Sequence, residues 1–336
     1  MKARSGSAEQ NKSRRREPAQ IPVDSRRLSR FRRRLDRLAG RGMGLLTWLA
    51  SGLVLLIAAA LIIRSWPLWS AHPLGRLLTG TEWRPLRGEF GFGPFIAGSF
   101  AVTILAMALA VPPSLLCAIY LAEYAPRRLH RLVKPLIDLL AGIPSVVYGL
   151  WGIQMVVPFV RDVLTPLVNA ILRRIDQSAH VENATGYGLL AGGIVLAVMV
   201  LPVIIAVAEE VIRAVPAGMR QAALALGATH WQMVKGVALR RSLPGIIAAV
   251  VLGFSRAFGE TMAVMMVVGN VPQVPRSLFD AAYPLPALIA NNYGEMMSIP
   301  LYDSALLTAA LILLAIVLVF TLVARVVLLR AIRRAS

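Results

Sequence analysis

Six long apolar runs divide the chain into hydrophobic and polar segments. Four of them carry no charge, whereas the third and the fifth contain one and two ionisable residues. A helix needs roughly 20 apolar residues to cross the hydrocarbon core of a bilayer, and these runs have about that length. The runs cover residues 45–63, 95–121, 136–159, 187–208, 244–270 and 304–324. The pattern therefore predicts an all-α integral membrane protein with six transmembrane helices, in a domain over residues 44–330.

The segment ahead of the first run is strongly basic. Residues 1–43 hold 14 Lys and Arg against 4 Asp and Glu. From Arg26 onward, apolar residues recur at helical spacing among the arginines. They are Leu28, Phe31, Leu35 and Leu38. Residues 1–43 thus form a basic tail, which is either an amphipathic helix on the membrane surface or a charged segment that only fixes orientation.

The overall charge agrees with a membrane protein. Charged residues make up 16% of the chain, below the roughly 25% of soluble domains. The net charge of +19 would suggest a nucleic-acid partner if it covered a soluble surface, but the basic residues lie between the apolar runs. The composition therefore indicates a lipid environment and no nucleic acid.

The basic residues also predict the topology. The segments 1–43, 123–134, 209–243 and 325–336 hold 27 Lys and Arg, whereas the segments that alternate with them hold 7. Because basic residues accumulate on the cytoplasmic side, both termini are expected in the cytoplasm. The longest interior loop is then 209–243. On the outside we expect a short surface helix over 164–175 and a loop over 271–303.

The fifth apolar run carries the charged pair Arg256 and Glu260. An ionisable side chain at mid-membrane costs about 2.5–3.5 kcal/mol on insertion scales, so it usually faces a bundle interior or a polar path. The spacing of four residues puts both side chains on one helical face, where they can pair. The pair either lines a path or only ties helices together.

The third run contains helix-breaking and polar residues. Gly142, Pro144 and Gly149 permit a break or close helix packing. The hydroxyls of Ser145 and Tyr148 either face a substrate or bond to a helix backbone.

Signatures of an enzyme are missing from the sequence. It has no phosphate-binding loop for ATP and no Ser/His/Asp arrangement, and its four histidines show no metal-ligand spacing. We therefore expect no enzymatic activity, no cofactor and no metal, so any energy source lies on another chain.

The segment from Gln221 to Leu239, Q-A-A-L-A-L-G-A-T-H-W-Q-M-V-K-G-V-A-L, closely resembles the EAA loop of ABC importer permeases. The resemblance implies a type I ABC importer permease fold, in which a short helix of this cytoplasmic coupling loop docks on an ATPase. Ala222, Ala223 and Gly227 match the family pattern, whereas Gln221 replaces the usual Glu and Arg240 replaces a usual Pro. ATPase coupling is thereby assigned to residues 221, 222, 223 and 227.

Two further motifs are similar to phosphate permeases, and to the PstC branch rather than PstA. They are L-A-G-I-P-S-V-V-Y-G-L-W-G from Leu140 and R-A-F-G-E-T-M-A-V-M-M-V-V-G-N from Arg256. The resemblance covers about residues 88–330, with the permease core at 95–329. It implies that this chain is a permease subunit and forms half of the transmembrane path of an ATP-driven, high-affinity phosphate importer in a bacterial inner membrane. The implied partners are a PstA-like permease, a PstB-like ATPase dimer and a periplasmic or tethered PstS-like phosphate-binding protein.

The candidate substrate path combines these residues. A guanidinium offers a planar fork matched to phosphate oxygens, which makes Arg256 the leading residue and Glu260 its counter-charge. Ser145 and Tyr148 are the further candidates. Two alternatives stay open: an ABC permease for another oxyanion such as sulfate or molybdate, or a carrier or channel without an ATPase. A carrier would often show an internal repeat, and we find none.

The topology is testable by cysteine labelling. Cysteines placed in residues 1–25, in 209–243 or after 330 should react only from the cytoplasm, whereas cysteines near Glu82 or Asn291 should react from outside. Impermeant thiol reagents measure reaction from outside on intact cells and reaction from the cytoplasmic side on inverted vesicles. Reaction of the 209–243 segment from outside would overturn the six-span topology.

Overall fold

The computed structural model describes residues 25–175, 181, 183–295 and 299–335. The chain forms two compact units, Met1–Ile57 and Ala58–Ser336. The described part of the first unit belongs to helix α1 (Ser25–Ala71), which continues without a break into the second unit. Between Leu38 and Ile57 every residue except Gly44 is exposed. The side chains of Leu28, Phe31 and Leu35 lie outside the described residues, so the position of this segment on a membrane surface stays a prediction.

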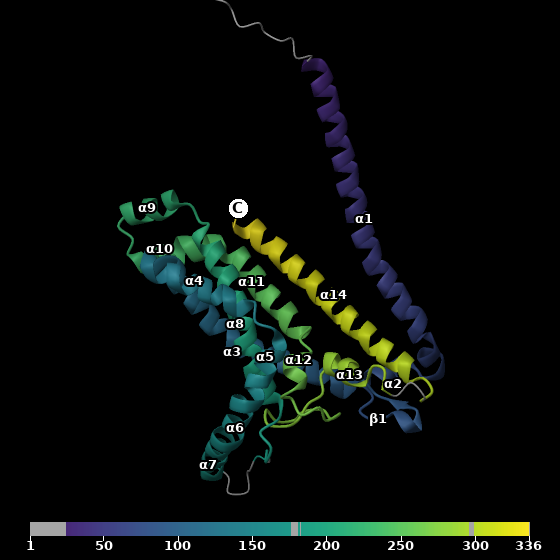
Figure 1. Ribbon diagram of the computed structural model, residues 1–336. Coiled ribbons are helices and arrows are strands. Elements are labelled where there is room, and N and C mark those ends of the chain that lie inside the picture. Colours follow the sequence, from purple (N-terminus) through teal and green to yellow (C-terminus); the bar gives the residue numbers. More distant parts are fainter. Residues whose placement is uncertain (1–24, 176–180, 182, 296–298, 336) are drawn as a thin grey trace, which may run out of the picture. The chain divides into compact units, whose positions relative to one another are not determined.

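Six helical segments in the described part of the chain are long and apolar enough to cross a membrane, as predicted. They run over Leu38–Ala71, Gly93–Tyr124, Ser145–Arg174, Leu189–Arg213, His230–Phe258 and Tyr302–Arg330. The last belongs to α14 (Tyr302–Ala335). Figure 1 labels the helices of the second unit by their number in chain order. The number of spans is confirmed, whereas several of their ends differ from the sequence prediction.

Helix α8 (Leu189–Arg213) lies at the centre of the second unit, and 61% of an apolar stretch of 18 residues within it is buried. It packs against α3 (Gly93–Ile119) and α11 (Arg240–Phe258). A Cβ atom on Gly193 of α8 would lie 2.6 Å from a methyl carbon of Leu105 of α3. Small residues let apolar helices approach this closely, and dispersion contacts then hold them together in lipid.

The third span is displaced from its predicted position. Residues 127–141 form a separate helix, α4 (Arg127–Ala141), and the span begins at α5 (Ser145–Trp151). Pro144 disfavours helical backbone at the residue before it, which explains the break. From α5 the helix continues through α6 (Val157–Phe159) to α7 (Thr165–Ile175), with π-helical turns between them. The predicted span over 136–159 and the separate surface helix over 164–175 are therefore wrong, because 164–175 ends the third span.

The fifth span also differs from the prediction. It starts at α10 (His230–Met233), passes through the π-helical turn Val234–Leu239, and ends with α11 at Phe258. A separate turn, α12 (Met262–Met265), follows, so one helix over 244–270 is wrong. Because α8 reaches Arg213 and α10 begins at His230, only residues 214–229 connect the fourth and fifth spans. They contain α9 (Ala217–Ala225).

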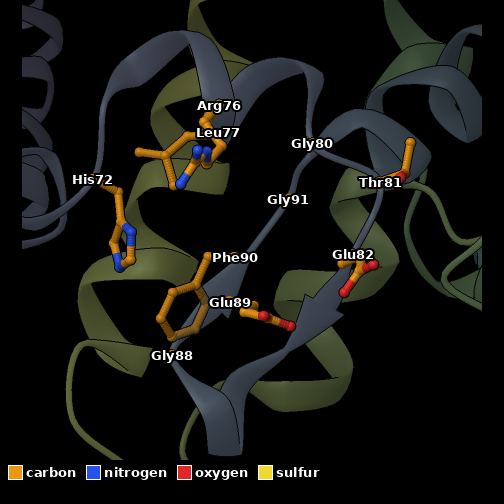
Figure 2. Close-up of a pocket in the computed structure, with 10 residues that line it drawn as sticks. All are labelled: His72, Arg76, Leu77, Gly80, Thr81, Glu82, Gly88, Glu89, Phe90 and Gly91. Carbon is orange, nitrogen blue, oxygen red and sulfur yellow. The ribbon is translucent and has the colours of Figure 1, made fainter.

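A short helix and a hairpin between the first and second spans belong to an aromatic cluster. After α2 (Leu74–Thr79), strands β1 (Trp83–Arg84) and β2 (Glu89–Phe90) pair in an antiparallel hairpin. The ring of Trp83 contacts the rings of Phe90, Phe92, Phe95 and Tyr302. A Cβ atom on Gly91 would lie 2.5 Å from the Gly80 carbonyl oxygen, so this close approach requires glycine. The hairpin and α2 enclose a cavity of about 360 Å³ (Figure 2).

The segment between the fifth and sixth spans is attached to α3. The Ser99 hydroxyl donates to the Phe95 carbonyl oxygen over 2.8 Å and accepts from the Leu285 amide over 2.8 Å. Leu285 begins α13 (Leu285–Asn292), which also packs on α14. This buried hydroxyl therefore fixes the return segment against the start of the second span.

The packing of α11 on α8 is testable at Gly253. An added Cβ would lie 2.6 Å from Ile204 Cγ1 and 3.1 Å from Val200 Cγ1. Gly253→Val should therefore lower the free energy of unfolding by about 1–3 kcal/mol through overpacking. Gly236→Val is the matched control, since a Cβ atom on Gly236 would meet no packing neighbour within 4 Å. The midpoint of thermal unfolding in detergent measures both; an equal shift in the two variants would contradict the packing argument.

Candidate functional site

A tyrosine of α5 forms a hydrogen bond across the break between α4 and α5. Residues Gly142 to Pro144 separate the two helices, and Ser145 is the first residue of α5. The buried Tyr148 hydroxyl donates to the Leu140 carbonyl oxygen over 2.8 Å. The hydroxyl of half-buried Ser145 has no hydrogen-bond partner among the described residues. Tyr148 therefore uses its one donor on the backbone, whereas Ser145 keeps its donor for another group.

Arg256 reaches the same break from α11. It lies in the last turn of that helix, and its Nη2 donates to the Ala141 carbonyl oxygen over 3.2 Å. The guanidinium thus meets the carboxyl end of α4, where a cation is favoured by the helix dipole. Arg256 is exposed in the isolated chain. One of its five N–H donors is used on Ala141, so further donors remain available for an anion.

Glu260 lies beyond a second break. Helix α11 ends at Phe258, and Glu260 Oε1 accepts the Ala263 amide of α12 over 3.1 Å. No ion pair joins Arg256 to Glu260 among the residues that the structure describes. The expected pairing on one helical face is therefore wrong for this structure, because the helix ends between the two residues.

The two breaks are held side by side because α12 packs on α5. A Cβ atom on Gly149 would lie 2.5 Å from Met266 Sδ and 3.2 Å from Ala263 Cα. The absence of a side chain at Gly149 thus lets α12 contact α5. Of the four residues predicted for the substrate path, three make hydrogen bonds at these breaks, and Ser145 starts the helix after the first break.

The predicted coupling residues lie on or just after α9. Gln221 and Ala222 are exposed, whereas Ala223 packs against the Met233–Val234 cluster. Helix α9 has no buried residue, and Leu226 beside it is 89% exposed. Gly227 ends this turn with φ of 84°, a left-handed conformation that favours glycine. The segment therefore presents an exposed surface, and the turn that follows α9 depends on Gly227.

An ion pair that the sequence did not reveal attaches α9 to the spans. Arg220 Nη2 and Nε donate to Glu123 Oε1 over 2.8 and 3.1 Å. The same guanidinium donates to the carbonyl oxygens of Ile212, over 2.8 Å, and Val215. The Glu123 side chain is only 5% exposed. One arginine of α9 therefore joins the end of the second span to the end of the fourth.

A ring contact attaches the other end of the coupling segment. The rings of Tyr124 and His230 meet edge to face with centroids 4.7 Å apart. Glu123 and Tyr124 are neighbours in the π-helical turn Tyr120–Tyr124, so this turn contacts the coupling segment both at α9 and at α10. Nothing in the sequence of this turn, Y-L-A-E-Y, indicates which distant residues it contacts.

The arrangement suits anion binding rather than covalent chemistry. An exposed guanidinium with spare donors lies at two adjacent helix breaks, and the Ser145 hydroxyl at the start of α5 is unbonded among the described residues. Within the described residues, no group of three His, Cys, Asp or Glu side chains is placed to hold a metal ion.

Known proteins are similar to this chain in sequence. The chain is 36% identical to the probable ABC transporter permease protein YqgH of Bacillus subtilis (strain 168), over 88% of this chain and 92% of the relative. It is 36% identical to the phosphate transport system permease protein PstC of Xylella fastidiosa (strain 9a5c), over 84% of this chain and 87% of the relative. It is 34% identical to the phosphate transport system permease protein PstC 2 of Mycobacterium tuberculosis (strain ATCC 25618 / H37Rv), over 92% of this chain and 95% of the relative.

A solved structure has a similar fold. It is a chain of the MetNI methionine ABC transporter in an inward facing conformation, with a TM-score of 0.52 and 21% identity over 70% of this chain and 93% of that chain. Residues 114–333 match the family described as binding-protein-dependent transport system inner membrane component. With six candidate spans and relatives that align over most of its length, the chain belongs to this family of multi-pass membrane transport subunits.

Proposed function

We propose that this chain is the permease subunit of an ATP-driven importer of inorganic phosphate and forms half of its transmembrane path. The observation that carries the proposal is Arg256, an exposed guanidinium at the meeting point of two helix breaks. The phosphate transport proteins at 34–36% identity support the choice of substrate. A fixed cation lowers the energy barrier for an anion near the middle of the membrane, where the fifth apolar run carries Arg256.

The proposed path uses the residues unequally. Arg256 binds phosphate oxygens through the donors that Ala141 leaves free, and Ser145 adds one hydroxyl donor. Tyr148 holds the first break through Leu140 and shapes the path rather than donating to phosphate. Glu260 acts as the counter-charge when Arg256 leaves the Ala141 carbonyl, because its Oε2 has no partner among the described residues.

The proposal includes an ATPase, a second permease and a phosphate-binding protein as partners. A PstB-like ATPase dimer hydrolyses ATP and receives α9 with Gln221, Ala222, Ala223 and Gly227 at the contact. Arg220 and Glu123 then pass the motion of α9 to the second and fourth spans. A PstA-like permease completes the path, and a PstS-like phosphate-binding protein delivers phosphate from outside. Both termini lie in the cytoplasm.

The experiment for the proposed function is uptake of radioactive phosphate by the reconstituted complex, with sulfate and arsenate as competitors. ATP-dependent phosphate accumulation that arsenate reduces and sulfate does not is the expected result, because arsenate shares the shape and charge of phosphate. Accumulation of labelled sulfate or molybdate in place of phosphate would assign the chain to another oxyanion.

Arg256 gives the sharpest test of the path. Arg256→Ala should lower phosphate uptake by at least about 100-fold, since it removes the cation from the proposed path. Arg256→Lys keeps the charge but loses the fork, so it should retain part of the activity. Uptake per membrane-inserted protein, in cells lacking other phosphate transporters, measures both variants.

Arg276→Ala is the control for Arg256, because it removes an exposed arginine from the segment after the fifth span. It should transport at the parental rate. Parental uptake by Arg256→Ala would make Arg256 structural and move the path to other helices.

Gly227 tests the coupling segment. Gly227→Val forces a β-branched residue into a φ of 84° and should strongly reduce transport by disturbing the end of α9. Gly227→Asn should keep most of the activity, since asparagine tolerates this conformation. Transport and co-purification of the ATPase are both measured. Equal activity of the valine and asparagine variants would show that this backbone conformation is not needed for coupling.

A further inference from the structure

A basic cavity lies at the start of α4, among residues that the proposed transport path does not use. Its volume is about 560 Å³. It is lined by Leu121, Ala122, Ala125, Arg127, His130, Arg131 and Arg213. Four of the seven lining residues are basic and none is acidic, which is the composition of an anion site rather than of a packing defect.

The charges around the cavity leave an excess of positive charge. The carboxylate of Glu209 is buried behind it, with Oε1 2.9 Å from His130 Nε2 and 3.3 Å from Arg213 Nη1. Lys134 Nζ lies 3.4 Å from the other Glu209 oxygen and 3.6 Å from Asp138 Oδ1. Glu209 is thus shared among three basic groups.

Two arginines remain without such a partner. Among the described residues, no carboxylate pairs with Arg127 or Arg131, and the Arg131 Nε donates only to the Arg127 carbonyl oxygen over 3.4 Å. Both residues are exposed and line the cavity. Their guanidinium groups therefore keep most of their donors for a ligand.

The backbone of α4 adds to this field. The helix is 15 residues long and begins at Arg127, and its first intrahelical acceptor is the Pro126 carbonyl, which receives the His130 amide over 3.1 Å. The amides of residues 127–129 therefore have no helical acceptor. Amides and dipole at a helix start favour an anion, and phosphate groups bind there readily.

The remainder of α4 indicates where the anion comes from. Leu132, Leu136 and Leu139 are exposed at 65%, 52% and 69%. A helix with a basic start and an exposed apolar face is typical of a membrane interface. Residues 123–134 belong to the side predicted to be cytoplasmic, where anionic lipids attract basic segments.

We propose that this cavity binds the phosphate group of an anion at the membrane surface, held by Arg127, Arg131 and the first amides of α4. The phosphate belongs either to an anionic phospholipid headgroup or to free inorganic phosphate. Arg213 stays shared with Glu209 and shapes the cavity wall. Arg256 is not among the lining residues, so this cavity is separate from the proposed transport path.

The lipid arm of the test uses the transporter with the full-length chain in nanodiscs of mixed phosphatidylglycerol and phosphatidylcholine. Native mass spectrometry counts the phosphatidylglycerol retained after transfer to detergent. The variant carrying both Arg127→Gln and Arg131→Gln should retain on the order of tenfold less, because two charge-assisted contacts are lost. Arg128→Gln is the control, since Arg128 is an exposed neighbour that does not line the cavity.

The phosphate arm measures equilibrium binding of radioactive inorganic phosphate in phosphatidylcholine nanodiscs, in an Arg256→Ala background. Saturable binding that the double variant loses and Arg128→Gln keeps assigns the site to free phosphate. Loss confined to phosphatidylglycerol assigns it to a lipid headgroup. If neither ligand depends on Arg127 and Arg131, or if Arg128→Gln weakens binding as much as the double variant, the proposal is overturned. Unchanged elution and thermal midpoints of the variants exclude misfolding as the cause of a loss.

Discussion

Backbone carbonyl groups that a helix leaves free in apolar surroundings need hydrogen-bond donors, and this requirement organises the centre of the protein. The chain is interrupted between α4 and α5 at Gly142–Pro144, where the Leu140 carbonyl accepts the Ile143 amide over 3.3 Å, and the Ala141 carbonyl accepts no backbone amide among the described residues. Tyr148 and Arg256 supply the donors. The need to satisfy two carbonyl groups thereby brings a charged residue from α11, distant in sequence, to the end of α4.

The same requirement explains why the two breaks lie together. Arg256 can reach Ala141 only if α11 ends near the α4–α5 junction, and Gly149 allows α12 to follow closely against α5. Glu260 then bonds to the Ala263 amide, which stabilises the first turn of α12. The arrangement leaves the guanidinium exposed while its position is fixed, which is what a binding site for an anion needs.

Hydropathy predicted the number of spans because an apolar run of sufficient length has few other places to lie. It placed the third span too early because residues 136–141 are apolar apart from Asp138, although Pro144 separates them from the span. It also joined Arg256 and Glu260 in one helix, since neither Gly259 nor Thr261 is a strong enough signal to end it. Arg256, Ser145 and Gly227 were nevertheless found as candidates, because charge, polarity or a motif stood out against their surroundings.

Contacts between distant segments could not be predicted in the same way. Glu123 and Arg220 lie 97 positions apart, and each looks like an ordinary charged residue of a loop until the fold brings them together. The exposed arginines of α4 counted only toward topology, since a cavity has no signature in a linear sequence. Local patterns therefore identified the elements, whereas the pairings depended on how those elements pack.

The Glu123–Arg220 contact also constrains how this chain can change over generations. Removing one partner of a buried ion pair leaves an uncompensated charge, which typically costs about 3–5 kcal/mol. A substitution at either position alone must pass through a protein in which Glu123, or the carbonyls of Ile212 and Val215, lose their donor. We therefore expect positions 123 and 220 to change together, so that descendants keep both residues or replace both.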